Sequence, residues 1–227
     1  MSPLPYLLSP HEQGSVGWFA DRAGRVTGSM ADAVTAEGRK GGEAVTRRNY
    51  RYQLACERLT GRPILSDFTN SHIERGRALE GEARQRYEQA TSALVRQAGF
   101  AYWSELPIGC SVDGFVGENG FVEIKCPLPA IHIDYLEANR VPPNYIRQVL
   151  HNMLVTQADF CDFISFNKEL PEDLQLFVYR AERSVLAQDL RTYRSLLEEF
   201  LREVDVLTKH LSHLGQTRKP NVATAGH

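Results

Sequence analysis

Cys110 to Pro127 reads Cys-Ser-Val-Asp-Gly-Phe-Val-Gly-Glu-Asn-Gly-Phe-Val-Glu-Ile-Lys-Cys-Pro, and this stretch decides the fold. Residues 108–116 and 120–126 each alternate between apolar and other residues well enough to predict a strand. Between them, Gly117 to Gly120 has the composition of a hairpin turn. The stretch therefore predicts two antiparallel strands joined by a tight connection.

Polar side chains interrupt this hairpin at unexpected places. Asp113 lies inside the first strand, and Glu123 and Lys125 lie two residues apart in the second, so their side chains leave one face. One interpretation is the solvated face of an ordinary antiparallel hairpin. The other is a metal site, in which carboxylates from adjacent strands bind a divalent cation and the ammonium faces a water or phosphate. The hairpin alone leaves both open.

Length and composition predict a single globular domain over residues 1–227, with 42% hydrophobic and 24% charged residues. No apolar run reaches the roughly 18 residues of a membrane span, so we expect no membrane association. The first ten residues lack the pattern of a secretory signal, which favours the cytoplasm. The four cysteines form no Cys-x-x-Cys pair, which argues against a zinc or redox motif.

Charge is unevenly distributed in a chain whose net charge is −2. Between Arg22 and Arg62, basic residues outnumber acidic ones, so the rest of the chain is acidic. Such a zone fits a polyanionic partner or a solvated helix face. Near its start, Thr27 and Ser29 could cap a helix beginning near Met30, and with Arg22 and Arg25 they could form an anion pocket. The alternative is simple capping beside exposed arginines.

The order of predicted elements indicates an α/β fold with a central mixed β-sheet flanked by helices. We expect an extended arm over residues 1–15 and a flexible tail over residues 216–227. Expected helices cover residues 45–59, 71–90 (capped by Asn70), 130–138 as a short helix or turn, 144–157 and 184–214. Further strands are expected over residues 101–104, 160–166 and 174–180.

The order of five polar residues resembles the PD-(D/E)xK nuclease superfamily, and these are Glu80, Asp113, Glu123, Lys125 and Gln148. More narrowly, the chain resembles phage lambda exonuclease and the YqaJ-like viral recombinase nucleases. The matching pieces are Trp18-x-x-x-Arg22-x-x-x-x-Thr27-x-Ser29, Gly76-x-x-x-Glu80, Ser111-x-Asp113-Gly114, Glu123-x-Lys125-Cys-Pro127 and Tyr145-x-x-Gln148-Val. The family usually has proline where Val112 stands, but Asp113 and Gly114 are retained.

This resemblance implies a magnesium-dependent exonuclease that degrades one strand of linear double-stranded DNA from its 5′ end. It implies release of 5′-mononucleotides, 3′ overhangs for recombination by strand annealing, and two Mg²⁺ ions for which Mn²⁺ substitutes. It also implies a homotrimeric ring, a single-strand annealing protein as partner, and a phage or prophage origin in a bacterial host. The alternatives are an endonuclease of the restriction or junction-resolving kind and a catalytically inactive DNA-binding module.

The resemblance also assigns roles to single residues. Asp113 would bridge two metals, Glu123 and the carbonyl of Ile124 would bind the first, and Glu80 would bind the second. Lys125 would orient or deprotonate the attacking water. Gln148 would help to hold the site. The 5′-phosphate would be bound by Arg22 and Ser29, with Arg25 and Ser111 as further candidates. His210 and His213 are expected to be solvated.

Overall fold

A computed structural model describes residues 6–38, 41–64, 71–97 and 99–217, without the side chains of residues 71–74 and 77. Its α-helices are α1 (Val16–Arg22), α2 (Ala31–Thr35), α3 (Val45–Thr60), α4 (Ser71–Thr91), α5 (Pro129–Ala138), α6 (Pro143–Thr156) and α7 (Ala187–Thr217). The short 3-10 helices are η1 (Gly28–Met30) and η2 (Glu172–Leu174). The strands are β1 (Leu7–Leu8), β2 (Val26–Thr27), β3 (Val95–Arg96), β4 (Ala101–Tyr102), β5 (Ile108–Cys110), β6 (Gly114–Val116), β7 (Gly120–Lys125), β8 (Phe160–Phe166) and β9 (Leu176–Glu182).

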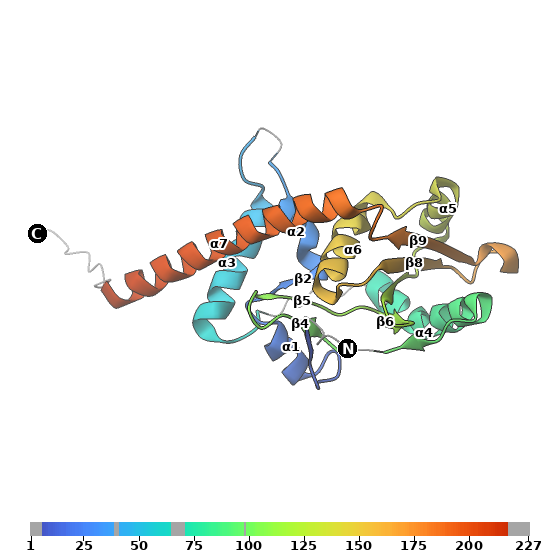
Figure 1. Cartoon of the computed structure of the whole chain (residues 1–227), viewed down its shortest axis with the longest axis horizontal. Helices are drawn as coiled ribbons and strands as arrows, with labels where there is room; N and C mark the ends of the chain where they lie inside the picture. The colour runs from blue at the N-terminus through green and yellow to red at the C-terminus, as the bar shows by residue number, and fades with distance from the viewer. Residues whose placement is uncertain (1–5, 39–40, 65–70, 98, 218–227) are drawn as a thin grey trace, which may run out of the picture.

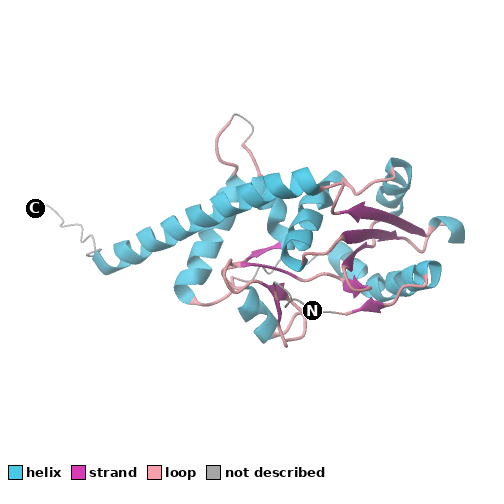
Figure 2. Cartoon of the chain, in the orientation of Figure 1, coloured by secondary structure: helices cyan, strands magenta, loops and turns pink. Residues whose placement is uncertain are grey.

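The larger sheet has the order β3-β6-β7-β8-β9 and is mixed, because β7 and β8 run parallel while its other neighbours are antiparallel. The predicted hairpin is confirmed: β6 pairs with β7, and Gly117 takes a φ of +58°, which the turn needs and glycine permits. The sheet lies between two layers of helices (Figures 1 and 2), so the predicted α/β sandwich is confirmed.

The alternation of side chains along β7 explains these two layers. Val122 and Ile124 pack on one face with Ala83 and Tyr87 of α4. Phe121 belongs to the other cluster, together with the buried residues of α6 and α7. Glu123 therefore shares the α6 side of the sheet, since residues two apart on a strand leave the same face.

The predicted strand over residues 108–116 is wrong in one respect, because it is two strands in different sheets. β5 belongs to a smaller sheet of order β1-β4-β5-β2, whereas β6 belongs to the larger one. Ser111, Val112 and Asp113 connect them. The main-chain N–H of Asp113 donates to the carbonyl of Val122 at 3.2 Å. Asp113 is thus placed where the two sheets meet.

The N-terminal arm contributes to the smaller sheet, because β1 pairs antiparallel with β4. The Ser9 N–H donates to the carbonyl of Phe100 at 2.8 Å, and Nδ1 of His11 lies 2.8 Å from the carboxylate of Asp21. These contacts fix the arm against the body, which its lack of periodicity did not predict.

Neither hydroxyl proposed as a helix cap performs that role. Thr27 belongs to β2 and Ser29 lies inside η1, and α2 begins after Met30 without a side-chain capping bond. Thr27 stands at the N-cap position of η1, but its side chain makes no capping bond there, so the predicted capping by a hydroxyl is wrong. The proposed cap Asn70 lies outside the described residues, as do residues 218–227 of the expected tail.

Three arginines of the basic zone pair with carboxylates of α7, and these are Arg47, Arg51 and Arg58. Arg47 forms a two-point contact with Glu203 of α7, at 2.7 and 2.8 Å, and Arg51 also binds Glu203 at 2.9 Å. Arg58 pairs with Asp205. These ion pairs therefore hold α3 against α7. The three arginines neither form a free site for a polyanion nor lie on a solvated helix face.

The long helix α7 buries one stripe, from Leu190 to Val204, against α3 and α6. In Figure 1 it continues beyond them toward the C-terminus, where Leu211 and Leu214 are exposed. His210 and His213 are exposed as well, so their prediction is confirmed. None of the helices among the described residues is long and apolar enough to cross a membrane.

Candidate active site

The connection between the two sheets fixes the carboxylate of Asp113. The N–H of Ile124 donates to its Oδ2 at 2.6 Å, so the side chain of one strand end is tied to the main chain of the next strand. This bond replaces a ladder bond that the broken strand cannot make. It also brings Ile124, whose carbonyl is a predicted metal ligand, next to Asp113.

Glu123 is the most enclosed carboxylate of the site, with 1% of its surface exposed. Its Oε1 accepts hydrogen bonds from Nζ of Lys125 and Nε2 of Gln148, both at 2.5 Å. The ammonium of Lys125 also lies 4.9 Å from the ring centre of Tyr145, a distance at which a cation interacts with the ring. The predicted grouping of Glu123, Lys125 and Gln148 is therefore present.

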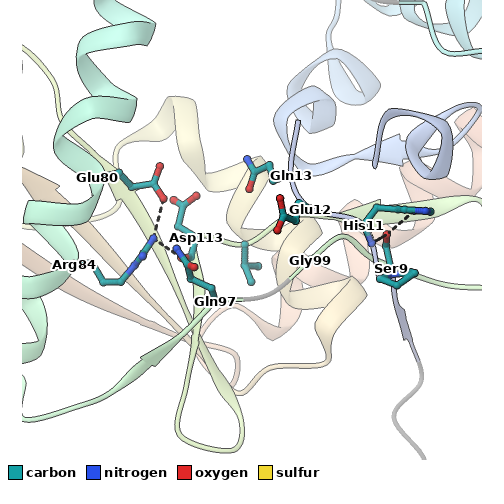
Figure 3. Close-up of a pocket in the computed structure, with 11 residues that line it drawn as sticks. Ser9, His11, Glu12, Gln13, Glu80, Arg84, Gln97, Gly99 and Asp113 are labelled. Carbon is teal, nitrogen blue, oxygen red and sulfur yellow. Dashed lines mark hydrogen bonds and ion pairs between the residues drawn. The ribbon is translucent and has the colours of Figure 1, made fainter. Parts of the chain in front are cut away.

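Glu80 reaches the site from α4, on the other side of the sheet. Arg84, one turn later, donates to Oε1 of Glu80 at 3.1 Å and to the main-chain oxygen of Asp113 at 3.4 Å. In Figure 3, Glu80 and Asp113 lie on one side of a cleft and Glu12 and Gln13 of the N-terminal arm on the other. The cleft has a volume of about 420 Å³.

The pKa values of the site reflect its closely spaced negative charges. Burial, reinforced by the charge of Asp113, raises the pKa of the Glu80 carboxyl group. Burial also raises the pKa values of Asp113 and Glu123, against the opposing effect of Lys125. For Lys125 itself, burial opposes the charged form, but the carboxylates of Glu123 and Asp113 outweigh it and raise the pKa.

Among the described residues, no three acidic, histidine or cysteine side chains converge on one point as they stand. The reason is that Arg84 holds Glu80, while Lys125 and Gln148 hold Glu123. The donor set nevertheless fits a divalent cation. Asp113 raises the pKa of both glutamates, so a positive charge among these oxygens would stabilise the cluster, and carboxylates are the ligands that Mg²⁺ prefers.

The predicted phosphate-binding residues separate into two groups. The guanidinium of Arg22 lies 4.1 Å from the ring centre of Trp18, and Nε1 of Trp18 donates to Oγ of Ser111 at 3.1 Å. Arg22 and Ser111 are thus linked through one indole, two residues before Asp113. Ser29 is exposed and does not line the cavity of about 250 Å³ beside Arg22.

Arg25 lines the same cavity as Arg22, but main-chain carbonyls hold part of its guanidinium. Its Nε donates to the carbonyl of Asp21 at 3.0 Å and its Nη1 donates to the carbonyl of Trp103 at 2.8 Å. The guanidinium also stacks on Tyr102, 4.5 Å from the ring centre. These contacts hold α1 to the smaller sheet and direct two of its donors away from a ligand.

Comparison with known proteins agrees with this geometry. Residues 17–159 match the YqaJ-like viral recombinase domain, which is more than half of the 227 residues. The chain belongs to the YqaJ-like viral recombinase family. No curated protein sequence matched it.

Solved structures place this YqaJ-like protein beside exonucleases. The alkaline exonuclease LHK-Exo from Laribacter hongkongensis is 34% identical, with a TM-score of 0.76, and the alignment covers 89% of this chain and 98% of that one. The complex of LHK-Exo with dAMP gives a TM-score of 0.77 at the same identity and coverage. A phage-related exonuclease from Haemophilus somnus shares the fold at 13% identity, with a TM-score of 0.58 over 84% of this chain and 96% of that one.

Two residues of this YqaJ-like site were not predicted as part of it. Arg84 follows Glu80 by four positions in α4, and Asn152 follows Gln148 by four positions in α6. Asn152 donates from Nδ2 to Oε2 of Glu123 at 3.2 Å. Four residues make about one helical turn, so helical spacing from each predicted residue was a usable signal for its neighbour.

Proposed function

We propose that this YqaJ-like protein is a magnesium-dependent exonuclease that degrades one strand of linear double-stranded DNA from 5′ to 3′. The observation that carries the proposal is that Glu80 and Asp113 line one cleft, and that the Asp113 carboxylate is bonded to Ile124, between the paired Glu123 and Lys125. The chain is also 34% identical to an alkaline exonuclease. That relative was solved with dAMP, a deoxynucleoside monophosphate. This supports 5′-mononucleotides as products and 3′ overhangs on the remaining duplex.

The proposed cofactor is a pair of Mg²⁺ ions, replaceable by Mn²⁺. Asp113, Glu123, the carbonyl of Ile124 and Glu80 would hold them. Ions bound there would neutralise phosphate charge and acidify a bound water.

The residues of the chain would then carry out an ordinary hydrolysis. Lys125, fixed by Glu123, orients the attacking water. Its raised pKa keeps it protonated while the neighbouring carboxylates are uncompensated, so it can act as a base only after their charge is neutralised and its ammonium has lost a proton. The water would then give a proton to neutral Lys125 as its oxygen bonds to phosphorus and the bond from phosphorus to O3′ breaks, and the departing O3′ would take up a proton from solvent. Gln148 keeps Glu123 in place throughout.

The terminal 5′-phosphate would bind near Arg22 and Ser111. The guanidinium can donate to phosphate oxygens while it stacks on Trp18, and the Ser111 hydroxyl, which accepts from that indole, keeps its own proton to donate. Binding the end close to Asp113 would place the first phosphodiester bond at the metals, which is what an exonuclease needs.

The proposal includes a homotrimeric ring, a single-strand annealing protein as partner, and action in the cytoplasm of a bacterial host. These parts rest on the family rather than on contacts of the chain. Light scattering on the purified protein tests the ring. We expect three times the mass of one 25.6 kDa chain, and a stable monomer that digests DNA would remove the ring from the proposal.

One gel tests the reaction. Linear duplex with 5′-phosphate ends, the same duplex with 5′-hydroxyl ends, and a covalently closed circle are each incubated with Mg²⁺, with Mn²⁺ and with a chelator. We expect the phosphorylated duplex to shorten with either metal, the 5′-hydroxyl duplex to be degraded more slowly, and the circle to stay intact. A cut circle would indicate an endonuclease, and binding without cleavage would indicate an inactive module.

A further inference from the structure

Two amide side chains of α6 lie on one face of that helix and hold one carboxylate between them. Gln148 donates from Nε2 to Oε1 of Glu123 at 2.5 Å, and Asn152 donates from Nδ2 to Oε2 at 3.2 Å. A single hydrogen bond lets a carboxylate pivot about it. Two bonds to different oxygens fix both its position and its rotation, which metal coordination demands.

The hydrogen bonds of Asn152 indicate that this residue does more than stabilise the fold. Asn152 is 1% exposed, and its Oδ1 has no donor among the described residues. An unpaired buried acceptor is destabilising, and an apolar side chain of similar size would avoid that cost. The Nδ2 amino group of Asn152 must therefore have a role that offsets this cost, and the group to which it donates is the carboxylate of Glu123.

The opposite half of the amide points at η1. A Cβ atom on Gly28 would lie 2.2 Å from Oδ1 of Asn152, far inside contact distance. The backbone of Gly28 is not in the left-handed region, so no turn geometry requires glycine there. Its missing side chain instead leaves room for the Asn152 amide.

This packing also fixes the orientation of the amide. If it were turned over, Oδ1 would face Oε2 of Glu123, and two acceptors would repel each other. Only the observed orientation gives an attractive contact with an ionised carboxylate. Gly28 and Asn152 therefore act as one unit toward Glu123.

We propose that Asn152 is a positioning residue of the metal site, and that Gly28 is glycine because any side chain would displace the Asn152 amide from Glu123. The inference rests on the proposed function, because it assigns Glu123 to the metal. It predicts that disturbing either residue weakens metal binding even in the absence of DNA.

The first test compares Asn152→Leu with wild type by titration calorimetry with Mg²⁺ alone. Loss of a partner that orients a metal ligand typically lowers metal affinity about ten- to a hundredfold, and we expect a loss in this range. Thr156→Val is the matched control, because Thr156 is a buried polar residue of the same helix whose hydroxyl donates to the carbonyl of Asn152 at 2.7 Å and makes no contact with Glu123. We expect its Mg²⁺ affinity to stay within about twofold of wild type.

A double-mutant cycle keeps the test decisive should Asn152→Leu fold poorly. Gly28→Ala should weaken Mg²⁺ binding in the wild-type background but not further in Asn152→Ala, where the shortened side chain leaves space for the methyl group. If Gly28→Ala weakened Mg²⁺ binding equally in both backgrounds, the proposed coupling between Gly28 and Asn152 would be overturned.

The outcomes separate this inference from the proposed function. Wild-type protein that binds no Mg²⁺ and cleaves no DNA would sink the proposed function. Wild-type protein that binds Mg²⁺, together with a folded Asn152→Leu of equal affinity, would sink only the role of Asn152. A variant with lower thermal stability but unchanged Mg²⁺ affinity would reduce Asn152 to a structural tie between α6 and β7.

Discussion

The ammonium of Lys125 lies 2.5 Å from Oε1 of Glu123, so a buried carboxylate and its counterion come from the same face of one strand. Each group favours the charged form of the other, although burial still leaves the pKa of Glu123 raised, and both lie on β7, which pairs with β8. The pair is therefore built into the sheet, and removing one partner leaves the other charge without compensation.

Lys125→Met should lower the cleavage rate at least about a hundredfold, since a positioned proton-transfer group contributes about a hundred- to ten-thousandfold. The variant should be less stable, because buried Glu123 loses its counterion, but it should still fold because methionine fills similar space. Rates on linear duplex and circular dichroism spectra measure the two effects. Lys168→Met is the control, because Lys168 is exposed. A Lys125→Met rate near that of wild type would contradict the assigned role.

Arg22→Gln should remove the preference for 5′-phosphorylated ends while leaving cleavage possible. A hydrogen bond to a charged group contributes about 1.5–3 kcal/mol, so the ratio of rates on phosphate and hydroxyl ends should fall at least about tenfold. Arg25→Gln is the matched control. Its Nε and Nη1 donate to the carbonyls of Asp21 and Trp103, so this change should lower stability and keep the ratio. If Arg25→Gln lost the preference for 5′-phosphate ends and Arg22→Gln kept it, the 5′-phosphate would be assigned to Arg25 instead of Arg22.

Stability should fall in mild acid because His151 is buried in its neutral form. Its Nε2 donates to the carbonyl of Gly109 at 3.0 Å and its Nδ1 accepts from the Tyr193 hydroxyl at 2.8 Å. Burial lowers its pKa to about 4 from 6.5. Between these values the unfolded chain binds the proton and the folded chain does not. The stability that depends on neutral His151 is thus complete above about pH 6.5. It is lost as the pH falls toward 4, and the free energy of unfolding falls by about 3 kcal/mol.

Urea unfolding at several pH values checks this expectation. His151→Phe should be less stable at neutral pH but should show a shallower loss between about pH 6.5 and about pH 4. His213→Gln, which changes an exposed histidine, should keep the wild-type slope. An unchanged slope in His151→Phe would mean that another group, such as buried His132, whose pKa is also lowered by burial, governs acid sensitivity.

Arg47→Ala should destabilise the fold by about 1–2 kcal/mol, between the values for exposed and buried ion pairs. The pair with Glu203 joins α3 to α7, and the Arg47 side chain is 17% exposed. The loss should be smaller at high salt, which screens the partly exposed pair. Urea unfolding at low and high salt measures it. Arg194→Ala breaks only an exposed pair with Glu198 and should have little effect.

This prediction also tests whether the basic zone binds DNA. If Arg47 serves only the contact with α7, the rate on linear duplex should be unchanged once the protein is folded. If folded Arg47→Ala cleaved linear duplex more slowly and low salt restored its rate, the basic zone would be assigned to nucleic-acid binding.

Sequence patterns predicted the long elements and the polar residues of the hairpin, for physical reasons. The helices α3, α6 and α7 each bury one apolar face, so their periodicity is visible. The strands β7 and β8 are buried on both faces and stand out as short, mainly apolar runs. The break at Ser111–Asp113 was not predictable from alternation. The pattern records which residues are apolar, but it does not record that the partner strands change from β4 to β7.

The shorter features depend on contacts distant in sequence. Strand β1 has two residues and carries too little pattern to distinguish it from an extended arm. Thr27 and Ser29 have the chemistry of caps, but the pairing of β2 with β5 decides where the backbone goes. Asn152 could have been found only by asking what else lies on the helix face of Gln148.

Asp113 sits at the joint between the two sheets, yet its carboxylate accepts from the Ile124 N–H and its own N–H donates to the Val122 carbonyl, and both partners belong to the larger sheet. The carboxylates proposed for hydrolysis therefore lie on β7, α4 and that joint, whereas Arg22 and Trp18, proposed to face the 5′ end, lie on α1 beside the smaller sheet. If these roles hold, an engineer could change which DNA terminus is accepted by redesigning α1 and leave the carboxylates untouched.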